Sequence, residues 1–524
     1  MLLRHRKSSD TLRRLLRNAS GNVAIIFALT LLPILLAVGA AVDYGHGNAV
    51  RVRIQAALDA TGLMVAQGIG TMPADELLDQ ADEMFAVNFI DEQGVAIGPL
   101  EVNVSGDVVT LSASAVVETT LMALGGIYEM NVGASTEIVR SEDSYEVVLV
   151  LDNTGSMGRN GKLQALQEST ELLIDNLFGE ADVHPLLDMG IVPFSHAVNV
   201  GTDNEDASWM DTLARNPLHR ENFDDEFVDQ GLTRFDLFDR FRNAEWAGCV
   251  EARAYPLDVT DAEATGANPS TLFVPYFAPD EPGDDYSGRG RRIDDYDNTY
   301  LDDQLDRIDR RATETERQEY TLKYTDGVSV RGRNSSYGPN YGCNARPILP
   351  LTNRKNDVLS AVEGMQASGY TNITEGLMWG MRTISPGEPF SQGKAYGTED
   401  HHKIIILLTD GRNQYYNDPG WNNENKSQYG PYGFMKSGRL VDSRSLRTIE
   451  AKMNERTAEA CEAVKDEDIV LFTITFQADD RTTENLMRDC ATEPSMYYDS
   501  PDAATLRTVF KSIATRISEL RISK

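Results

Sequence analysis

The chain is short of basic residues. Its 524 residues include 49 lysines and arginines against 81 aspartates and glutamates, so the formal net charge is −32. No long basic run offsets this excess, which argues against nucleic acid as a main partner, because phosphate binding requires clustered lysine and arginine. The charged fraction of 25% and the mean hydropathy of −0.35 exclude both wholesale disorder and a polytopic membrane protein. The length allows about two to four domains.

Cysteine is also scarce. The four cysteines, Cys249, Cys343, Cys461 and Cys490, include no C-x-x-C pair of the kind found in zinc or thioredoxin-like sites. In an oxidising compartment their even number predicts two disulfides. Pairing by proximity in the sequence joins Cys249 to Cys343 and Cys461 to Cys490, and four unpaired buried thiols are the alternative.

Long hydrophobic runs are absent except for residues 23–42, which carry no charge. Twenty residues rising about 1.5 Å each span a hydrocarbon core of about 30 Å, so we expect a transmembrane helix at residues 21–45. The basic segment 1–20 should stay in the cytoplasm, with the bulk of the chain on the other side of the membrane. A cleavable signal peptide is the alternative, with small residues at 37–41 as its cleavage region.

The helical pattern continues beyond the apolar run. Val50, Ile54, Ala57, Leu58 and Val65 lie at helical spacing, which predicts that the helix extends into the exterior compartment. Residues 46–140 are therefore expected to form a helical extension and a small α+β module. In that module, alternating residues on both sides of Ser105-Gly106-Asp107 predict a β-hairpin, followed by a short helix near 121–128 and a strand at 132–139.

From residue 141 the pattern changes to an alternation of strands and helices. The continuous apolar run that begins at Tyr145 is typical of a parallel strand buried on both faces. The expected strands are 145–151, 189–195, 403–409, 469–476 and 496–498, and the expected helices are 162–178, 358–365, 373–382, 445–464 and 502–520. This order predicts a doubly wound, mostly parallel α/β domain over residues 141–524.

A large insert interrupts that domain at about residues 200–345. Residues 201–310 contain 27 acidic and 11 basic residues, which is half of the net charge of the chain. The segment has too many aromatic residues to be disordered: Phe223, Phe227, Phe235, Phe238, Trp246, Tyr255, Phe273, Tyr276 and Phe277. Its acidic run from Asp294 to Asp303 lacks the glycine and glutamate of an EF-hand, so we interpret it as a solvated acidic face.

Oxygen-bearing side chains follow the predicted strands. The first strand ends in Asp152-x-Thr154-x-Ser156, the strand 403–409 ends in Asp410-Gly411, and Thr371 lies in a loop between them. Ligands of open α/β sheets bind at the carboxyl ends of the strands. Carboxylates and hydroxyls without histidine or cysteine suit Mg²⁺ best, with Ca²⁺ or Mn²⁺ as alternatives. The competing interpretation is that the two acids only cap helices or turns.

This ordered trio resembles the metal-ion-dependent adhesion site of von Willebrand factor A domains, which have a Rossmann-like fold. The resemblance implies that the hydroxyls of Thr154, Ser156 and Thr371 bind the ion and that Asp152 and Asp410 contact it directly or through water. The first hydroxyl position is more often serine, and Thr154 keeps the oxygen. An aspartate or glutamate of a protein partner would complete the coordination, and no catalytic or further cofactor-binding residue is implied.

A second resemblance extends beyond this domain: nearly the whole chain is similar to TadG-like proteins of bacterial tight-adherence (Flp) pilus systems. The resemblance is carried by the basic start, Gly21-Asn22-Val23-Ala24, Gly248-Cys249-Val250-Glu251, the motif LFVPYFAP from Leu272 and the ending LRISK. It implies a single-pass inner-membrane protein with its bulk in the periplasm, which assembles or anchors an adhesive pilus through protein partners, possible pilus components among them. Ile26 stands where TadE-type relatives carry the glutamate for prepilin processing, which favours a retained anchor.

Two other functions compete with this interpretation. One is a processed and released metal-dependent adhesin that binds a surface or matrix directly. The other is a phosphohydrolase with Asp152 as nucleophile, but such enzymes need a second aspartate where Thr154 stands. Ser195 and His196 adjoin in sequence, and we interpret them as a strand-end serine and a solvated histidine rather than a catalytic pair. We therefore do not expect an enzyme.

Aromatic residues follow Asp410 closely: Tyr415, Tyr416, Trp421, Tyr429 and Tyr432. They could form a rim around the site, since aromatic-rich loops often make binding surfaces, or they could pack within their own loop.

Overall fold

The computed structural model describes residues 19–69, 72–89, 94–105, 108–139, 143–282, 296–301, 312–330, 337–415 and 423–520. Several predicted features lie outside these residues: the segment 1–18, the turn residues Gly106 and Asp107, residues 294, 295, 302 and 303 of the acidic run, Tyr416, Trp421 and residues 521–524. The described part of that run, residues 296–301, is buried apart from Asp297, so it is not a solvated face. The chain divides into two compact units, residues 1–142 and residues 143–524.

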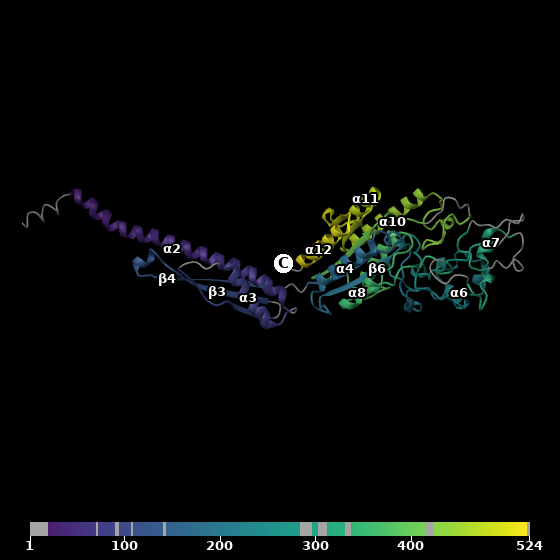
Figure 1. Cartoon of the computed structure of the whole chain (residues 1–524), viewed down its shortest axis with the longest axis horizontal. Coiled ribbons are helices and arrows are strands. Elements are labelled where there is room, and N and C mark those ends of the chain that lie inside the picture. Colours follow the sequence, from purple (N-terminus) through teal and green to yellow (C-terminus); the bar gives the residue numbers. More distant parts are fainter. Residues whose placement is uncertain are drawn as a thin grey trace, which may run out of the picture. The chain divides into compact units, whose positions relative to one another are not determined.

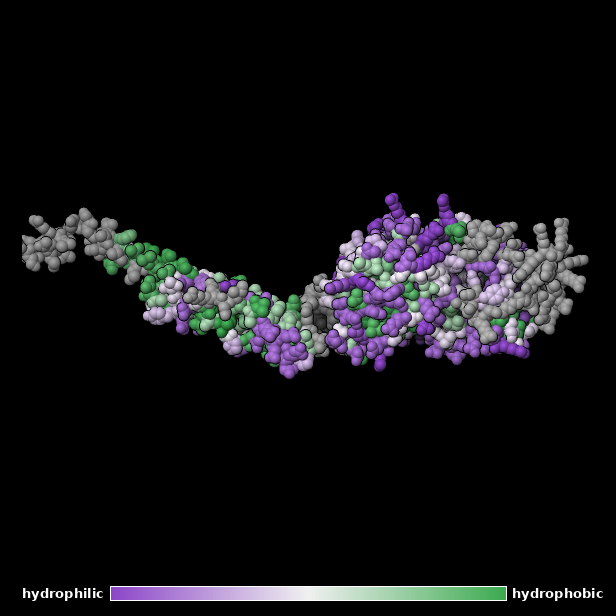
Figure 2. Space-filling model, viewed as in Figure 1, coloured by the Kyte–Doolittle hydropathy of each residue, from purple (hydrophilic) through white to green (hydrophobic). Residues whose placement is uncertain are grey.

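The N-terminal unit is built on one long helix, α2 (Ala19–Gly68). The segment Leu29–Ala66 of α2 is long and apolar enough to cross a membrane by length and composition. Figure 2 shows the hydrophobic residues of its described first half as a nearly continuous green stretch. In the second half, the five residues predicted at helical spacing from Val50 to Val65 are all buried, which confirms the amphipathic extension.

The buried face of α2 packs on a small antiparallel sheet and on α3 (Ala74–Asn88) (Figure 1). Strand β3 (Val108–Glu118) pairs along one edge with β1 (Val95–Ile97) and β2 (Glu101–Ser105) and along the other with β4 (Glu129–Val139). Alternate residues of β3 face the helix, as the predicted hairpin requires. The short helix predicted at 121–128 is only a 3-10 turn, Met122–Gly125.

The second unit contains a six-stranded sheet in the order β10-β9-β8-β5-β6-β7. Its strands are β5 (Ser144–Asp152), β6 (Leu187–Phe194), β7 (Leu349–Thr352), β8 (His401–Thr409), β9 (Val470–Phe476) and β10 (Tyr497–Ser500). All neighbours pair in parallel except β7, an antiparallel edge strand that the sequence pattern does not reveal. Every residue of β5 is buried, because this central strand is covered on both faces.

Helices cover the two faces of the sheet. Val147, Leu149 and Leu151 of β5 face one layer, and Val148 and Val150 face the other. The first layer consists of α4 (Lys162–Phe178), α8 (Lys355–Glu363) and α12 (Ala503–Leu520), and the second of α9 (Ile373–Ile384), α10 (Leu446–Asp466) and α11 (Arg481–Cys490) (Figure 1). Of these helices only α11 is missing from the sequence prediction. The doubly wound fold is confirmed.

The acidic insert is a folded part of the second unit. It contributes the short helices α5 (Asp225–Asp229), α6 (Arg234–Asp239) and α7 (Glu314–Glu319) and an aromatic core. The aromatic residues singled out in the sequence are buried there, apart from Tyr255. Trp209 packs on Phe273 and on Trp379 of α9, at ring-centroid distances of 5.8 and 6.5 Å, so the insert core is continuous with the sheet-covering layer.

Buried charge also ties the insert to the loop that follows β8. The carboxylate of Glu251 pairs with Arg234 inside the insert and accepts hydrogen bonds from Arg439 and from the hydroxyl of Tyr429, both in that loop. The two guanidinium groups hold the pKa of Glu251 below its ordinary value even though burial opposes this. Because the buried charges of this cluster neutralise one another, the cluster holds the insert and the loop together.

Both predicted disulfides are present, Cys249–Cys343 and Cys461–Cys490. The second joins α10 to α11. The first closes 94 residues of the insert into a loop.

Candidate metal centre

Four of the five predicted metal-binding residues, all but Thr371, contact one another at the carboxyl ends of β5 and β8, which are adjacent parallel strands. Asp152 is the last residue of β5, and Asp410 directly follows β8. Thr154 and Ser156 lie in the turn that connects β5 to α4. Thr371 precedes Asn372, the N-cap of α9. Residues far apart in the sequence are thus brought to one edge of the sheet by its topology.

Asp152 is completely buried and fixed by hydrogen bonds. Its Oδ1 accepts from the backbone N–H of Thr154 at 2.8 Å, and its Oδ2 accepts from the hydroxyl of Thr409 at 2.7 Å. Burial, and secondly the charge of Asp410, raises the pKa of Asp152 to about 6. The carboxylate is therefore held in a place where a second negative charge disfavours its ionised form.

The hydroxyls of the first motif point toward the second acid. Thr154 Oγ1 lies 2.9 Å from Ser156 Oγ, and Ser156 Oγ donates to Asp410 Oδ1 at 2.6 Å. These side chains hydrogen-bond one another rather than serving only nearby backbone amides. The capping interpretation accounts for the Asp152–Thr154 contact but not for this line of hydroxyls to Asp410.

The loop that carries Thr371 is held against the same motif. Ser368 N donates to Asn153 O at 2.7 Å, and Gly155 N donates to Gly369 O at 3.0 Å. Gly369 has a φ of +82°, and a Cβ there would lie 3.3 Å from the Ser195 side chain, so a glycine is required at this close approach. The carbonyl of Thr371 accepts from Gln414 N at 2.8 Å, which links this loop to the one after Asp410.

This donor set fits a hard divalent cation. Two neighbouring carboxylates and two converging hydroxyls provide oxygen ligands and an excess of negative charge, as Mg²⁺ requires. Across the described residues, no three histidine, cysteine, aspartate or glutamate side chains gather in a way that could hold a metal ion. A metal centre at this edge thus depends on its serine and threonine hydroxyls as much as on its acids.

One positively charged neighbour was not predicted from the sequence. Lys162, the first residue of α4, places its Nζ 3.0 Å from Asp410 Oδ2. Its side chain is mostly buried, so the ion pair is only weakly screened by solvent. An ammonium on this oxygen competes for the same negative charge that would attract a metal ion.

We expect Lys162→Met to strengthen Mg²⁺ binding by about three- to tenfold, because a charge-assisted contact to a carboxylate contributes on the order of 1 kcal/mol. Titration calorimetry of the variant and of the unaltered chain measures the change. Lys355→Met is a matched control, since Lys355 pairs with Asp175 at 2.9 Å, away from the strand ends. Weaker binding in Lys162→Met would instead mean that Lys162 supports the centre.

Comparison with known families identifies the parts of the chain. The Flp pilus-assembly TadE/G-like family matches residues 21–68, and the von Willebrand factor type A domain matches residues 337–512. The chain combines a TadE/G-like Flp pilus-assembly domain with a von Willebrand factor A domain. No curated protein gives a significant match. Together the two domains support a pilus-related adhesive role.

Solved structures similar to the chain include bacterial pilus proteins. The pilus adhesin SpaC of Lactobacillus rhamnosus GG is 12% identical, with a TM-score of 0.32, over 81% of this chain and 34% of that one. The von Willebrand domain of the type V pilus tip protein Mfa5 of Porphyromonas gingivalis is 10% identical, with a TM-score of 0.33, over 73% of this chain and 97% of that one. The pilus adhesin RrgA of Streptococcus pneumoniae is 12% identical, with a TM-score of 0.34, over 81% of this chain and 49% of that one. The chain thus spans about a third of the SpaC chain.

The acidic insert divides the von Willebrand A domain. The family match begins at residue 337 and includes Thr371 and Asp410, whereas Asp152, Thr154 and Ser156 precede the insert. Strand β5 nevertheless lies at the centre of the same sheet, paired with β8 from Ser144 to Leu151. The two halves of the candidate centre therefore come from the two sides of the insert.

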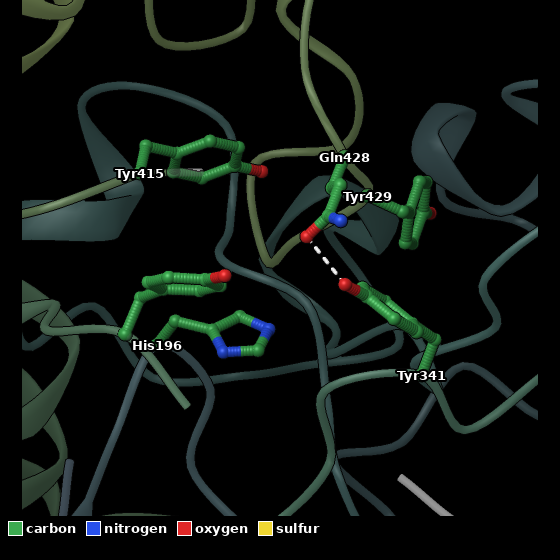
Figure 3. Close-up of a pocket in the computed structure, with 6 residues that line it drawn as sticks. His196, Tyr341, Tyr415, Gln428 and Tyr429 are labelled. Atoms are coloured by element: carbon green, nitrogen blue, oxygen red, sulfur yellow. Dashed lines mark hydrogen bonds between the residues drawn. The ribbon is translucent and has the colours of Figure 1, made fainter. Parts of the chain in front are cut away.

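Beside the centre, a small pocket is lined by His196, Tyr341, Tyr370, Tyr415, Gln428 and Tyr429 (Figure 3). His196 is buried, not solvated as predicted, because the chain after β6 turns inward under the insert. Burial lowers the pKa of His196 to about 4, so the imidazole is neutral. Ser195 Oγ lies 3.5 Å from Ala197 O, and no described residue hydrogen-bonds the ring of His196, so the two do not form a nucleophile–base pair.

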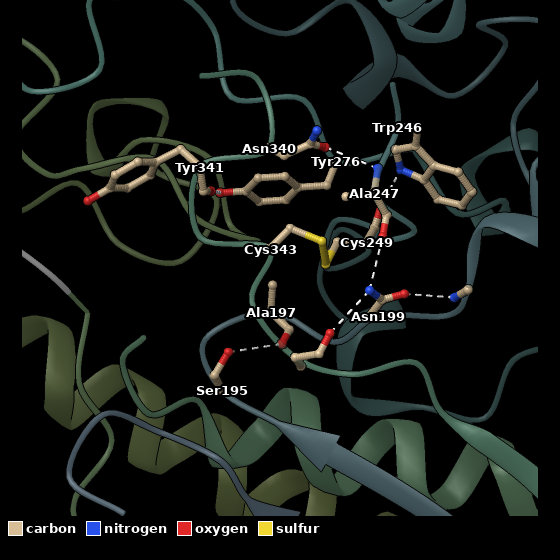
Figure 4. Close-up of a disulfide and its surroundings, with 12 residues drawn as sticks. Ser195, Ala197, Asn199, Trp246, Ala247, Cys249, Tyr276, Asn340, Tyr341 and Cys343 are labelled. Carbon is tan, nitrogen blue, oxygen red and sulfur yellow. Dashed lines mark hydrogen bonds between the residues drawn. A yellow bond between two sulfur atoms is a disulfide. The ribbon is translucent and has the colours of Figure 1, made fainter. Parts of the chain in front are cut away.

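The aromatic residues after Asp410 pack inside the protein. Tyr415, Tyr429 and Tyr432 are all buried, which favours loop packing over an exposed rim. Tyr429 lies in a cluster with the Cys249–Cys343 disulfide and Tyr276. Near that disulfide, Asn199 Nδ2 donates to Ala247 O and to Ala345 O at 3.0 and 3.1 Å, which joins the exit of β6 to the interior and to the end of the insert (Figure 4).

Proposed function

We propose that the second unit binds a divalent cation, Mg²⁺ first, and through it captures an acidic residue of a protein partner. The observation that carries this proposal is the convergence of Asp152, the Thr154–Ser156 hydroxyls and Asp410 at the ends of β5 and β8. Thr371, in the adjoining loop, would complete the protein's share of the ligands. The bound cation would supply a Lewis-acidic position for an aspartate or glutamate from outside.

The roles of this chain's residues follow from the contacts. Thr409 and the Thr154 N–H hold the Asp152 carboxylate in place, and Ser156 holds Asp410. Two backbone hydrogen bonds, at Ser368 and Gly369, fix the start of the loop that carries Thr371 to the first motif. Such fixed ligands lower the ordering cost of binding.

We place this activity in a protein anchored by α2 in the inner membrane, with both units outside the cytoplasm. The apolar segment of α2, its match to the TadE/G-like family and Ile26 in place of a processing glutamate support a retained anchor. The two disulfides are in keeping with an oxidising compartment. The function would be to assemble or anchor an adhesive pilus. Mass spectrometry of the mature N-terminus separates this from a processed, released adhesin.

Metal affinity should depend on pH. Because the pKa of Asp152 is raised from 3.8 to about 6, the carboxyl holds its proton through that interval, and the proton must leave before a cation can bind. Ionising Asp152 therefore costs folding stability as the pH rises through this window, and a bound cation offsets that cost. Calorimetry at about pH 5 and about pH 7.5 should show weaker Mg²⁺ binding at the lower pH, with proton release near pH 6. Equal affinity at both pH values would contradict this assignment.

The test of function is capture of pilus components by the full chain in native membranes. We expect proteins retained in Mg²⁺ to be released by a chelator and to be absent with Asp410→Ala. Asp175→Ala removes an exposed acid on α4 and serves as the control. Retention that survives both the chelator and Asp410→Ala would rule out a metal-dependent contact.

A further inference from the structure

The loop between β3 and β4 has an unusual composition for an exposed connection. Residues 119–128 read TTLMALGGIY and carry no charge, although Glu118 and Glu129 flank them. Leu124 is 78% exposed, Tyr128 is 68% exposed, and Leu121 and Ile127 are also exposed. Contiguous exposed apolar side chains of this kind mark an interaction surface.

The contacts of this loop fix its position along α2. The carboxylate of Asp43 accepts hydrogen bonds from the backbone N–H groups of Thr120, Leu121 and Met122 at 3.3, 2.9 and 2.6 Å. Four residues earlier on the helix, a Cβ at Gly39 would lie 2.5 Å from the Leu121 Cβ. A glycine there allows the loop to approach the helix closely.

The same loop reaches one turn further toward the start of α2. A Cβ at Gly125 would lie 3.6 Å from Leu36 Cδ2. The loop therefore lies against residues 36–43, a length of about 10 Å at 1.5 Å per residue. Figure 1 shows this connection beside the helix within the N-terminal unit.

Residues 36–42 are the last part of the uncharged stretch of α2, and Asp43 follows it directly. Exposed apolar side chains run along the helix from Ile26 to Val42, and the next charged residues after Asp43 are Arg51 and Arg53. The exposed side chains of the loop are thus level with the outer end of the apolar segment. The hydrogen bonds from the loop also satisfy Asp43, the first acid to follow that segment.

We infer that loop 119–128 is a second membrane-contacting element, with Leu124, Ile127 and Tyr128 seated in the lipid interface beside α2. The occupant of this surface is the same bilayer that α2 crosses, because the loop continues the exposed apolar surface of the helix. Tyrosine is enriched at this depth of a membrane. A second contact fixes the tilt and rotation of the N-terminal unit, which a single helix leaves free. This inference rests on the proposed anchoring through α2.

The test uses the full chain with one introduced cysteine, reconstituted in phosphatidylcholine nanodiscs. All four native cysteines are paired, so Leu124→Cys provides the single reactive thiol for an environment-sensitive NBD dye. Two matched positions are labelled in the same way: Val87→Cys, 76% exposed on α3, and Leu29→Cys, 70% exposed on the apolar part of α2. Phosphatidylcholines spin-labelled at the headgroup and along the acyl chain are the quenchers, because Leu29 lies inside the apolar segment.

We expect the dye at Leu124→Cys to shift its emission to the blue and to lose intensity with the spin-labelled lipid, as at Leu29→Cys, while the dye at Val87→Cys changes in neither respect. Quenching at Leu29→Cys with a water-exposed dye at Leu124→Cys would overturn the loop contact and leave the anchor intact. A blue shift at Leu124→Cys without lipid quenching would assign the surface to protein, a second copy or a partner, and would also overturn it. Absence of quenching at Leu29→Cys would reject the anchoring itself.

Discussion

Replacing Asp152 and Asp410 together by alanine is expected to abolish saturable binding of divalent cations to the chain. Both carboxylates belong to one hydrogen-bonded set, and the hydroxyls of Thr154 and Ser156 alone are too weak to dehydrate Mg²⁺. A cation at a hundredfold excess over its Kd stabilises the folded state by about 2.7 kcal/mol. The unaltered chain should therefore melt at a higher temperature in Mg²⁺, and the double variant should not.

Two single variants, Asp152→Asn and Asp410→Asn, control for the packing that the alanine substitutions remove. Each keeps the volume of the side chain and some of its hydrogen bonds while removing one negative charge. We expect each to weaken cation binding strongly without a comparable loss of stability in the absence of the ion. A double alanine variant that still gains stability from Mg²⁺ would place the cation elsewhere in the chain.

Opening the Cys249–Cys343 disulfide should have the largest effect on stability. On the chain-entropy estimate, a crosslink that closes 94 residues is expected to contribute about 4 to 5 kcal/mol. The Cys249→Ser/Cys343→Ser variant should thus lose that amount in the free energy of unfolding by denaturant. Both cysteines lie within the insert, so proteolytic cleavage within residues 200–345 should also become faster.

The other disulfide provides the comparison. Cys461–Cys490 closes only 29 residues and joins two neighbouring helices, for which the same estimate is about 3 to 4 kcal/mol. Its double serine variant should be less destabilised and should leave proteolysis of the insert unchanged. An equal or larger loss at Cys461–Cys490 would show that local strain or residual unfolded structure, not loop length, decides the contribution.

Much of the fold could be predicted because the strong patterns are local. The uninterrupted apolar run of β5 requires cover on both faces, and the structure provides it. The helical spacing from Val50 to Val65 requires one buried face, and β3 and β4 cover it. Strand β7 was missed because its four residues, LPLT, include a proline, which argues against a strand, and α11 because its sequence, RTTENLMRDC, is polar enough to resemble a loop.

The candidate site could be predicted in its ligands but not in its surroundings. Strand ends in a parallel sheet share an edge, so the order Asp152, Thr371, Asp410 along the chain was sufficient to group them. Lys162 gave no such signal, since a lysine at the start of a helix is common, and only the folded turn directs it to Asp410. The burial of His196 depends on how the insert folds over β6, which no local pattern encodes.

The most direct measurement is the anomalous diffraction of Mn²⁺ in crystals of the unit 143–524, which has its own hydrophobic cores. The account predicts one strong manganese peak within coordination distance of the Asp152 and Asp410 carboxylates and the Ser156 hydroxyl, with Thr371 facing it. An empty site in crystals soaked at saturating Mn²⁺, or a peak held only by acids of the insert, would contradict the account.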